Sequence, residues 1–166
     1  CPTAAAHPQY NREDIMEQTM DLMEAMRARH SVRRYKAQPL AAKLIDALQA
    51  EIDACNHAGG LHIQLVTNEP KAFSGMMARY GKFSGVTNYI AMIGKKAPDL
   101  DEKCGYYGER LVLRAQQLGL NTCWVAMTYS KVKTAYTVAP DEKLCIVIAL
   151  GYGENQGVSH EVKTIE

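Results

Sequence analysis

The sequence predicts a layered domain of the α/β or α+β class, in which helices pack on a sheet of four strands. Two observations carry this prediction. The chain has 166 residues, 47% of them hydrophobic and 22% charged, which suffices for the core of one domain. Segments with helical spacing of apolar residues also alternate with short apolar runs typical of strands. We expect residues 1–12 to be a loose lead-in and residues 13–166 to be a single domain.

The first half of the chain predicts three helices and one strand. Helical spacing extends over residues 13–26, and we expect its methionine-rich stripe to pack in the core rather than to form an adaptable binding face. A second helix is predicted over residues 40–58, before a pair of glycines. Apolar and polar residues alternate over residues 61–67, which indicates a strand, and a short helix is predicted near residues 71–79.

The second half predicts three strands and two helices. Strands are expected at residues 88–93, 122–127 and 144–150, and helices at residues 99–118 and 130–136. Gly119 follows the long helix and is expected to cap its C-terminus. The run over 144–150 is continuously apolar and rich in β-branched residues, so it predicts a buried central strand.

Charge and cysteine content exclude several classes of protein. The net charge of +1 gives no global attraction for nucleic acid or for an acidic membrane, and no run of about 18 apolar residues predicts a membrane span. Five cysteines without a C-x-x-C pair exclude a zinc ribbon and argue against a disulfide framework. His57 and His62 lack further ligands at metal-binding spacing, so no metal is expected. We expect a soluble, cytoplasmic protein.

A basic segment between the first two helices is the candidate binding site. Arg29 and Arg33 flank the hydroxyl of Ser31, and guanidinium groups with a hydroxyl donor suit a phosphate monoester. From charge alone, a solvated basic turn explains the segment better. Contact with nucleic-acid phosphates is a third possibility, against which the net charge and the shortage of interleaved aromatic residues argue.

Three segments, in order, resemble the FMN-dependent nitroreductase family. Residues 29–35, Arg-His-Ser-Val-Arg-Arg-Tyr, resemble the family's Arg-x-Ser-[Val/Ile]-Arg-x-[Tyr/Phe] signature. Residues 108–124 are similar to its central helix and the Gly-Leu-Gly-Thr-Cys-Trp entry into the next strand. Residues 146–153 resemble its late strand, which ends in Ile-Gly-Tyr. The resemblance implies an α+β fold with α/β/α layers: a mixed, mainly antiparallel sheet of four to five strands flanked by helices.

The resemblance also implies an FMN site. Arg29, Ser31 and Arg33 would hold the phosphate and ribityl chain, His30 would add backbone contacts, and the strand from Trp124 would lie near the flavin ring. The family has a basic phosphate-binding pair near its C-terminus, and Lys163 is the only basic residue after His160 here. The implied cofactor-binding residues are therefore Arg29, His30, Ser31, Arg33, Trp124, Val125, Ala126 and Lys163.

By the same resemblance, the protein is expected to be a homodimer that uses FMN. A ping-pong mechanism would transfer hydride from NADH or NADPH to FMN and then to a nitroaromatic, a quinone or a similar small-molecule acceptor, with no catalytic side chain. Two departures keep an alternative open. Residues 53–64 do not match the family's Pro-Ser-x-x-Asn-x-Gln-Pro segment, and the chain given stops at Glu166, as if truncated. The alternative is a non-catalytic flavin-binding or flavin-sequestering protein.

Overall fold

The computed structural model describes residues 20–159. The expected lead-in at residues 1–12, the start of the first predicted helix and Lys163 therefore lie outside the described residues. The elements, in chain order, are α1 (Leu22–Ala28), α2 (Ala42–Gly59), β1 (Gln64–Val66), the 3-10 helix η2 (Lys71–Phe73), α3 (Met76–Tyr80), β2 (Asn88–Lys95), α4 (Leu100–Gln117), β3 (Asn121–Val125) and β4 (Glu142–Gly151).

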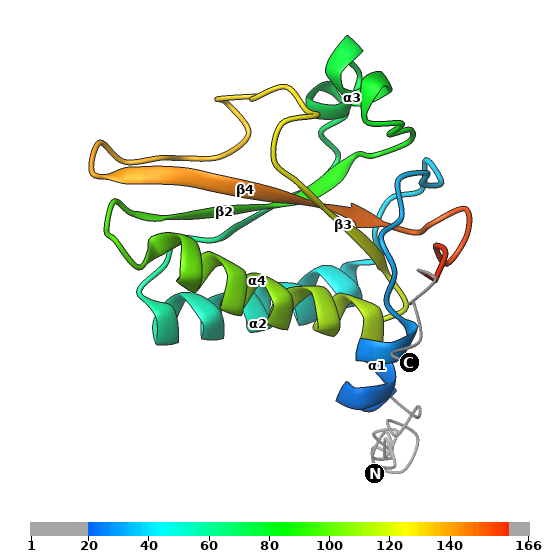
Figure 1. Cartoon of the computed structure of the whole chain (residues 1–166), viewed down its shortest axis with the longest axis horizontal. Helices are drawn as coiled ribbons and strands as arrows, with labels where there is room; N and C mark the ends of the chain where they lie inside the picture. Colours follow the sequence, from blue (N-terminus) through cyan, green and yellow to red (C-terminus); the bar gives the residue numbers. More distant parts are fainter. Residues whose placement is uncertain (1–19, 160–166) are drawn as a thin grey trace, which may run out of the picture.

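The four strands form one sheet in the order β1-β2-β4-β3, and every neighbouring pair is antiparallel. The inner strands β2 and β4 share the longest pairing, and Ile148 of β4 lies opposite both Ile90 of β2 and Trp124 of β3. The predicted central position of residues 144–150 is confirmed. Helices α2 and α4 cover one face of the sheet, whereas α3 and the loop from β3 to β4 lie over the other (Figure 1).

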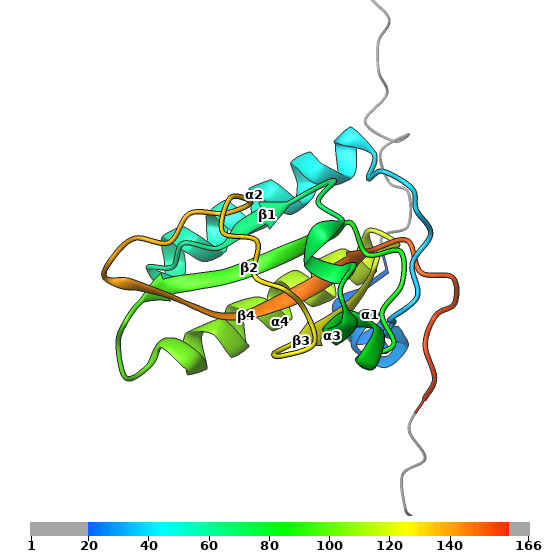
Figure 2. The same cartoon turned by 90° about the horizontal axis from the view of Figure 1, so that it is seen from above.

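Each face of the sheet carries its own core. On the helical face, Leu48 and Ile52 of α2 and Leu111 of α4 are fully buried against Ile90 and Ile148. Burying such a side chain contributes roughly 1.5–3 kcal/mol. Figure 2, seen from above, shows α2 and α4 running along the strands, as this packing requires. The other core is aromatic and includes Phe73, Phe83 and Tyr89, with the rings of the two phenylalanines 5.3 Å apart.

Helix α1 corrects one sequence prediction. It begins at Leu22, because Asp21 forms a capping box in which the Glu24 N–H donates to Asp21 Oδ1 at 2.8 Å. Residues 20 and 21 are therefore not helical. Leu22, Met23 and Met26 are 55%, 53% and 54% exposed, so the prediction that this stripe packs in the core is wrong for these residues. The helix has only two turns, and Ala25 is its buried residue.

The predicted helix over residues 130–136 is also wrong. The segment forms turns: the Ala135 N–H donates to the Val132 carbonyl at 3.0 Å, whereas the Ser130 N–H donates to the distant Ala72 carbonyl at 2.8 Å. Tyr136 then packs against the aromatic core. The predicted helix near 71–79 is divided into η2 and α3, and the strand over 61–67 narrows to β1, because Asn56 Oδ1 accepts the Ile63 N–H at 2.7 Å.

A carboxylate at the start of β4 predicts a pH effect on stability. Burial raises the pKa of Glu142, but hydrogen bonds from the Ala139 N–H and from His62 outweigh burial and hold that pKa below its usual range. Such a group stabilises the fold above its ordinary pKa, and this contribution is lost as pH falls through the lowered value. Between pH 6 and pH 3, Glu142→Gln should therefore lose less stability to acid than the wild type. Urea unfolding checks this, with Glu102→Gln on the exposed surface of α4 as control; equal acid losses in all three proteins would contradict it.

Candidate functional site

The segment between α1 and α2 is held against the sheet by alternate backbone contacts. The Val32 N–H donates to the Thr122 carbonyl on β3 at 3.1 Å, and the Tyr35 N–H donates to the Ser84 carbonyl at 2.9 Å. The side chains of Val32 and Tyr35 are buried. Because these two residues face inward, Ser31 and the arginines at 33 and 34 are left exposed on the outer side.

The exposed residues line a pocket of about 410 Å³, called here the arginine pocket. Four of the residues that the sequence singled out, Arg29, His30, Ser31 and Arg33, lie together in it. The lining is completed by Arg34, Lys82, Asn155, Gly157 and Val158. Among the described residues, its lining therefore contains four basic side chains and no carboxylate, which is a donor set suited to a multiply charged anion.

One nitrogen of the Arg29 guanidinium is paired, and another has no partner among the described residues. Its Nε lies 3.7 Å from Oε1 of Glu109 on α4. The other carboxylate oxygen of Glu109 accepts the indole N–H of Trp124 at 3.3 Å, so the three side chains form a chain of contacts. Arg29 Nη1 is buried and finds no hydrogen-bond partner among residues 20–159. A buried guanidinium nitrogen without a partner is costly unless an anion binds it.

The tail after β4 closes the pocket. Asn121 holds it: its Oδ1 accepts the Gly153 N–H, and its Nδ2 donates to Gln156 Oε1, both at 3.0 Å. Gly157 then lies at φ +83°, and a Cβ there would stand 2.5 Å from the Cβ of His30. Only glycine combines this left-handed conformation with so close an approach.

Trp124, Val125 and Ala126 do not line the arginine pocket. Trp124 packs between the sheet and α4, where a Cβ on Gly108 would overlap its indole ring. Val125 points into the aromatic core, because side chains alternate along β3. Ala126 follows the strand and is exposed.

Sequence reasoning missed five residues of the arginine pocket. Arg34 belongs to the basic segment that the sequence singled out, so its position there could have indicated it. The others, Lys82, Asn155, Gly157 and Val158, come from two distant loops. Lys82 has a left-handed backbone, with φ +60°, that the sequence does not reveal. The folded chain alone brings these loops to the arginines.

The thiol beside the pocket is not prepared for nucleophilic chemistry. Burial raises the pKa of Cys123, and this outweighs the opposing effect of the positive charges on Arg33 and Arg29. A protonated thiol is a poor nucleophile. The arrangement can therefore bind and orient an anion, and the chemistry would have to come from what is bound.

Comparison with known sequences identifies one family. The sequence model of the family described as "Putative TM nitroreductase" matches residues 21–166. The comparison with curated proteins gives no match. In the described part of the chain, no helix is long and apolar enough to cross a membrane.

Solved structures share the fold. A nitroreductase with bound FMN from Bacteroides fragilis is 21% identical, with a TM-score of 0.63, over 88% of this chain and 95% of that one. A nitroreductase in complex with FMN from Desulfovibrio desulfuricans is 19% identical, with a TM-score of 0.64, over 86% and 91%. An FMN-dependent nitroreductase from Clostridium difficile is 16% identical, with a TM-score of 0.63, over 84% and 91%. The expected α+β fold class is confirmed.

Proposed function

Since the chain belongs to the nitroreductase family, we propose that it is an oxidoreductase that binds FMN with its phosphate in the arginine pocket. One observation carries this proposal: Arg29, Ser31 and Arg33 line one cationic pocket, and the buried Nη1 of Arg29 has no hydrogen-bond partner among residues 20–159. The similar structures from Bacteroides fragilis and Desulfovibrio desulfuricans contain FMN, which supports the choice of ligand.

The residues present fit the phosphate of FMN. A phosphate dianion accepts several hydrogen bonds at once, and Arg29, Arg33 and the Ser31 hydroxyl supply charged and neutral donors from one short segment. Arg34 and Lys82 add positive charge. The phosphate would also give the buried Nη1 of Arg29 the partner that it lacks among the described residues.

FMN, when bound, would accept a hydride from NADH or NADPH and reduce a nitroaromatic, a quinone or a similar small molecule. The chain's own part is to bind and orient. Glu109 positions Arg29, and Trp124 in turn holds Glu109. Three strand residues are expected near the flavin ring. Ala126 is exposed. The side chains of Trp124 and Val125 pack in the two hydrophobic cores on opposite faces of the sheet. His30 and Lys163 remain proposed cofactor contacts.

We propose further that two copies associate to complete the site. The apolar side chains of α1 and Tyr106 of α4, which is 66% exposed, lie on the surface of one copy. Clustered exposed apolar residues mark interaction surfaces. A groove of about 320 Å³ lined in part by Leu22, Tyr106 and Leu113 continues this surface. A homodimer burying on the order of 2,000 Å² would cover it.

Substitution of Met26 by glutamate should shift the protein from dimer to monomer, because a charge would be buried in the interface. Light scattering at micromolar concentration checks this against the 18.4 kDa mass of one chain. Lys95→Gln makes the same change of charge at the far end of β2 and should remain dimeric (Figure 1). A wild-type protein that runs as a monomer with FMN present would contradict the dimer.

The proposed function is tested by titrating the purified protein with FMN and then with NADH or NADPH without oxygen. We expect a yellow one-to-one complex per chain that releases FMN on denaturation and loses its visible absorbance on addition of a nicotinamide donor. Return of the colour when a nitroaromatic or quinone is added would complete the cycle. A tight complex that neither donor bleaches would favour a flavin-sequestering protein, and no complex would overturn the proposal.

A further inference from the structure

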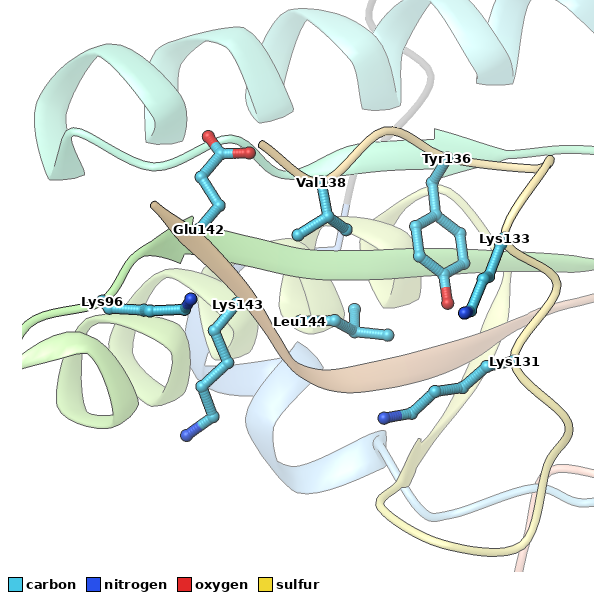
Figure 3. Close-up of a pocket in the computed structure, with 8 residues that line it drawn as sticks. All are labelled: Lys96, Lys131, Lys133, Tyr136, Val138, Glu142, Lys143 and Leu144. Atoms are coloured by element: carbon cyan, nitrogen blue, oxygen red, sulfur yellow. The ribbon is translucent and has the colours of Figure 1, made fainter. Parts of the chain in front are cut away.

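A second pocket lies at the other end of the sheet. It has a volume of about 410 Å³ and lies between β4 and the loop that joins β3 to β4 (Figure 3). That loop is on the face of the sheet that α2 and α4 do not cover (Figure 1). Lysines at positions 96, 131, 133 and 143 surround the pocket, and it is called here the lysine pocket. The arginine segment lies at the opposite end of the molecule, so the two pockets are separate (Figure 1).

Within the described part of the chain, three of the four lysines have no counter-charge. Lys96 donates to the Pro140 carbonyl at 3.0 Å, and Lys143 lies 3.5 Å from Asp101. Lys131 and Lys133 form no ion pair within residues 20–159. Figure 3 shows both reaching from the loop toward the space above β4.

The one carboxylate in the lining does not neutralise these lysines. Glu142 is paired with His62 and accepts the Ala139 N–H, and its carboxylate points away from the centre of the pocket (Figure 3). Like charges gathered around one hollow repel each other, and a bound anion would relieve that repulsion.

The floor of the lysine pocket is apolar. Leu144 occupies its centre, and Val138 and the ring of Tyr136 form its sides (Figure 3). Burial raises the pKa of Tyr136, so its hydroxyl is a neutral donor at physiological pH. The hydroxyl end of the Tyr136 ring faces Lys133 (Figure 3). An apolar floor, an aromatic wall and a cationic rim together suit a flat ring that carries negative groups.

We propose that the lysine pocket binds an aromatic dianion, either an aryl phosphate or an aromatic dicarboxylate, as a site distinct from the arginine pocket. The ring lies over Leu144 and against Tyr136, and the anionic groups bind Lys131 and Lys133. The volume of the lysine pocket is at the lower end of the range for small-molecule pockets. We therefore expect a ligand with one ring or two fused rings.

Isothermal titration calorimetry of the whole protein tests this with two probes, 1-naphthyl phosphate and naphthalene-2,6-dicarboxylate. We expect at least one of them to bind, and the comparison tells which anionic group the pocket accepts. Inorganic phosphate and 1-naphthol, which carry the charge or the ring alone, should bind at least about tenfold more weakly, because each lacks half of the contacts.

Variants locate the bound probe. Lys131→Gln and Lys133→Gln should each weaken the affinity for the probe about threefold to tenfold. This range lies between the effects typical of exposed and of buried charged hydrogen bonds. Lys43→Gln on the exposed surface of α2 makes the same charge change and should leave the affinity unaltered. The proposal would be overturned if neither probe binds, or if both lysine variants bind the probe as the wild type does. It would also be overturned if Arg33→Ala abolishes binding, because the probe would then occupy the arginine pocket.

Discussion

Replacement of Arg29 by alanine should weaken FMN binding about ten- to a hundred-fold and leave riboflavin binding nearly unchanged. A charge-assisted hydrogen bond contributes about 1.5–3 kcal/mol, which corresponds to that range of affinity. Riboflavin lacks the phosphate, so it loses no such bond. The buried Nη1 of Arg29 has no hydrogen-bond partner among the described residues, so replacement of this arginine has the largest expected effect on FMN binding. Fluorescence titration of both ligands measures the two affinities.

Two further variants calibrate the result. Ser31→Ala should cost less, about 1 kcal/mol, because a neutral hydroxyl supplies one weaker donor. Arg27→Ala removes the same charge from the last turn of α1 at an exposed position outside the arginine pocket, and FMN affinity should change little. Equal losses for FMN and riboflavin in Arg29→Ala would mean that the basic segment supports the fold instead of recognising phosphate.

Gly85→Ala should destabilise the protein by about 3 kcal/mol or more, which is the largest effect expected on stability. Gly85 has φ +69°, a conformation that costs an L-residue roughly 1–2 kcal/mol. A Cβ there would also overlap the carbonyl oxygen of Tyr35, and backbone cannot move aside as a flexible side chain can. Urea unfolding followed by circular dichroism measures the free energy of unfolding.

Gly105→Ala is the matched control. It lies in α4 with nothing within 4 Å of the position that a Cβ would take. Alanine is the better helix former, so the variant should gain about 0.5–1 kcal/mol. A Gly85→Ala protein as stable as the wild type would show that the strand-like segment around Tyr35 can move away from its neighbour.

The sequence was most informative where hydrophobic periodicity and burial agree. Helix α4 and the central position of β4 were predicted because each buries a continuous apolar face. The stripe on α1 has the same spacing but remains exposed, since apolar periodicity shows that a stripe exists and not what packs against it. The helix predicted over residues 130–136 is wrong because tertiary contacts, which local spacing does not report, hold this segment: the Ser130 N–H donates to the Ala72 carbonyl, and Tyr136 packs against the aromatic core.

The sequence likewise predicted only part of the candidate site. Arg29, Ser31 and Arg33 lie in one segment and carry a family signature, so the sequence located them. Lys82 and Gly157 reach the arginine pocket only because two loops fold against that segment. One loop precedes β2, and the other follows β4. The indole N–H of Trp124 donates to Glu109, a contact that the sequence did not predict. No spacing in the sequence reports such tertiary contacts.

A crystal structure of the protein grown with FMN would show directly where the phosphate binds. We expect density for the phosphate in the arginine pocket, with Arg29, Ser31 and Arg33 as its donors and Nη1 of Arg29 among the contacting atoms. FMN with its phosphate in the lysine pocket, or bound without contact to Arg29 and Arg33, would contradict this expectation.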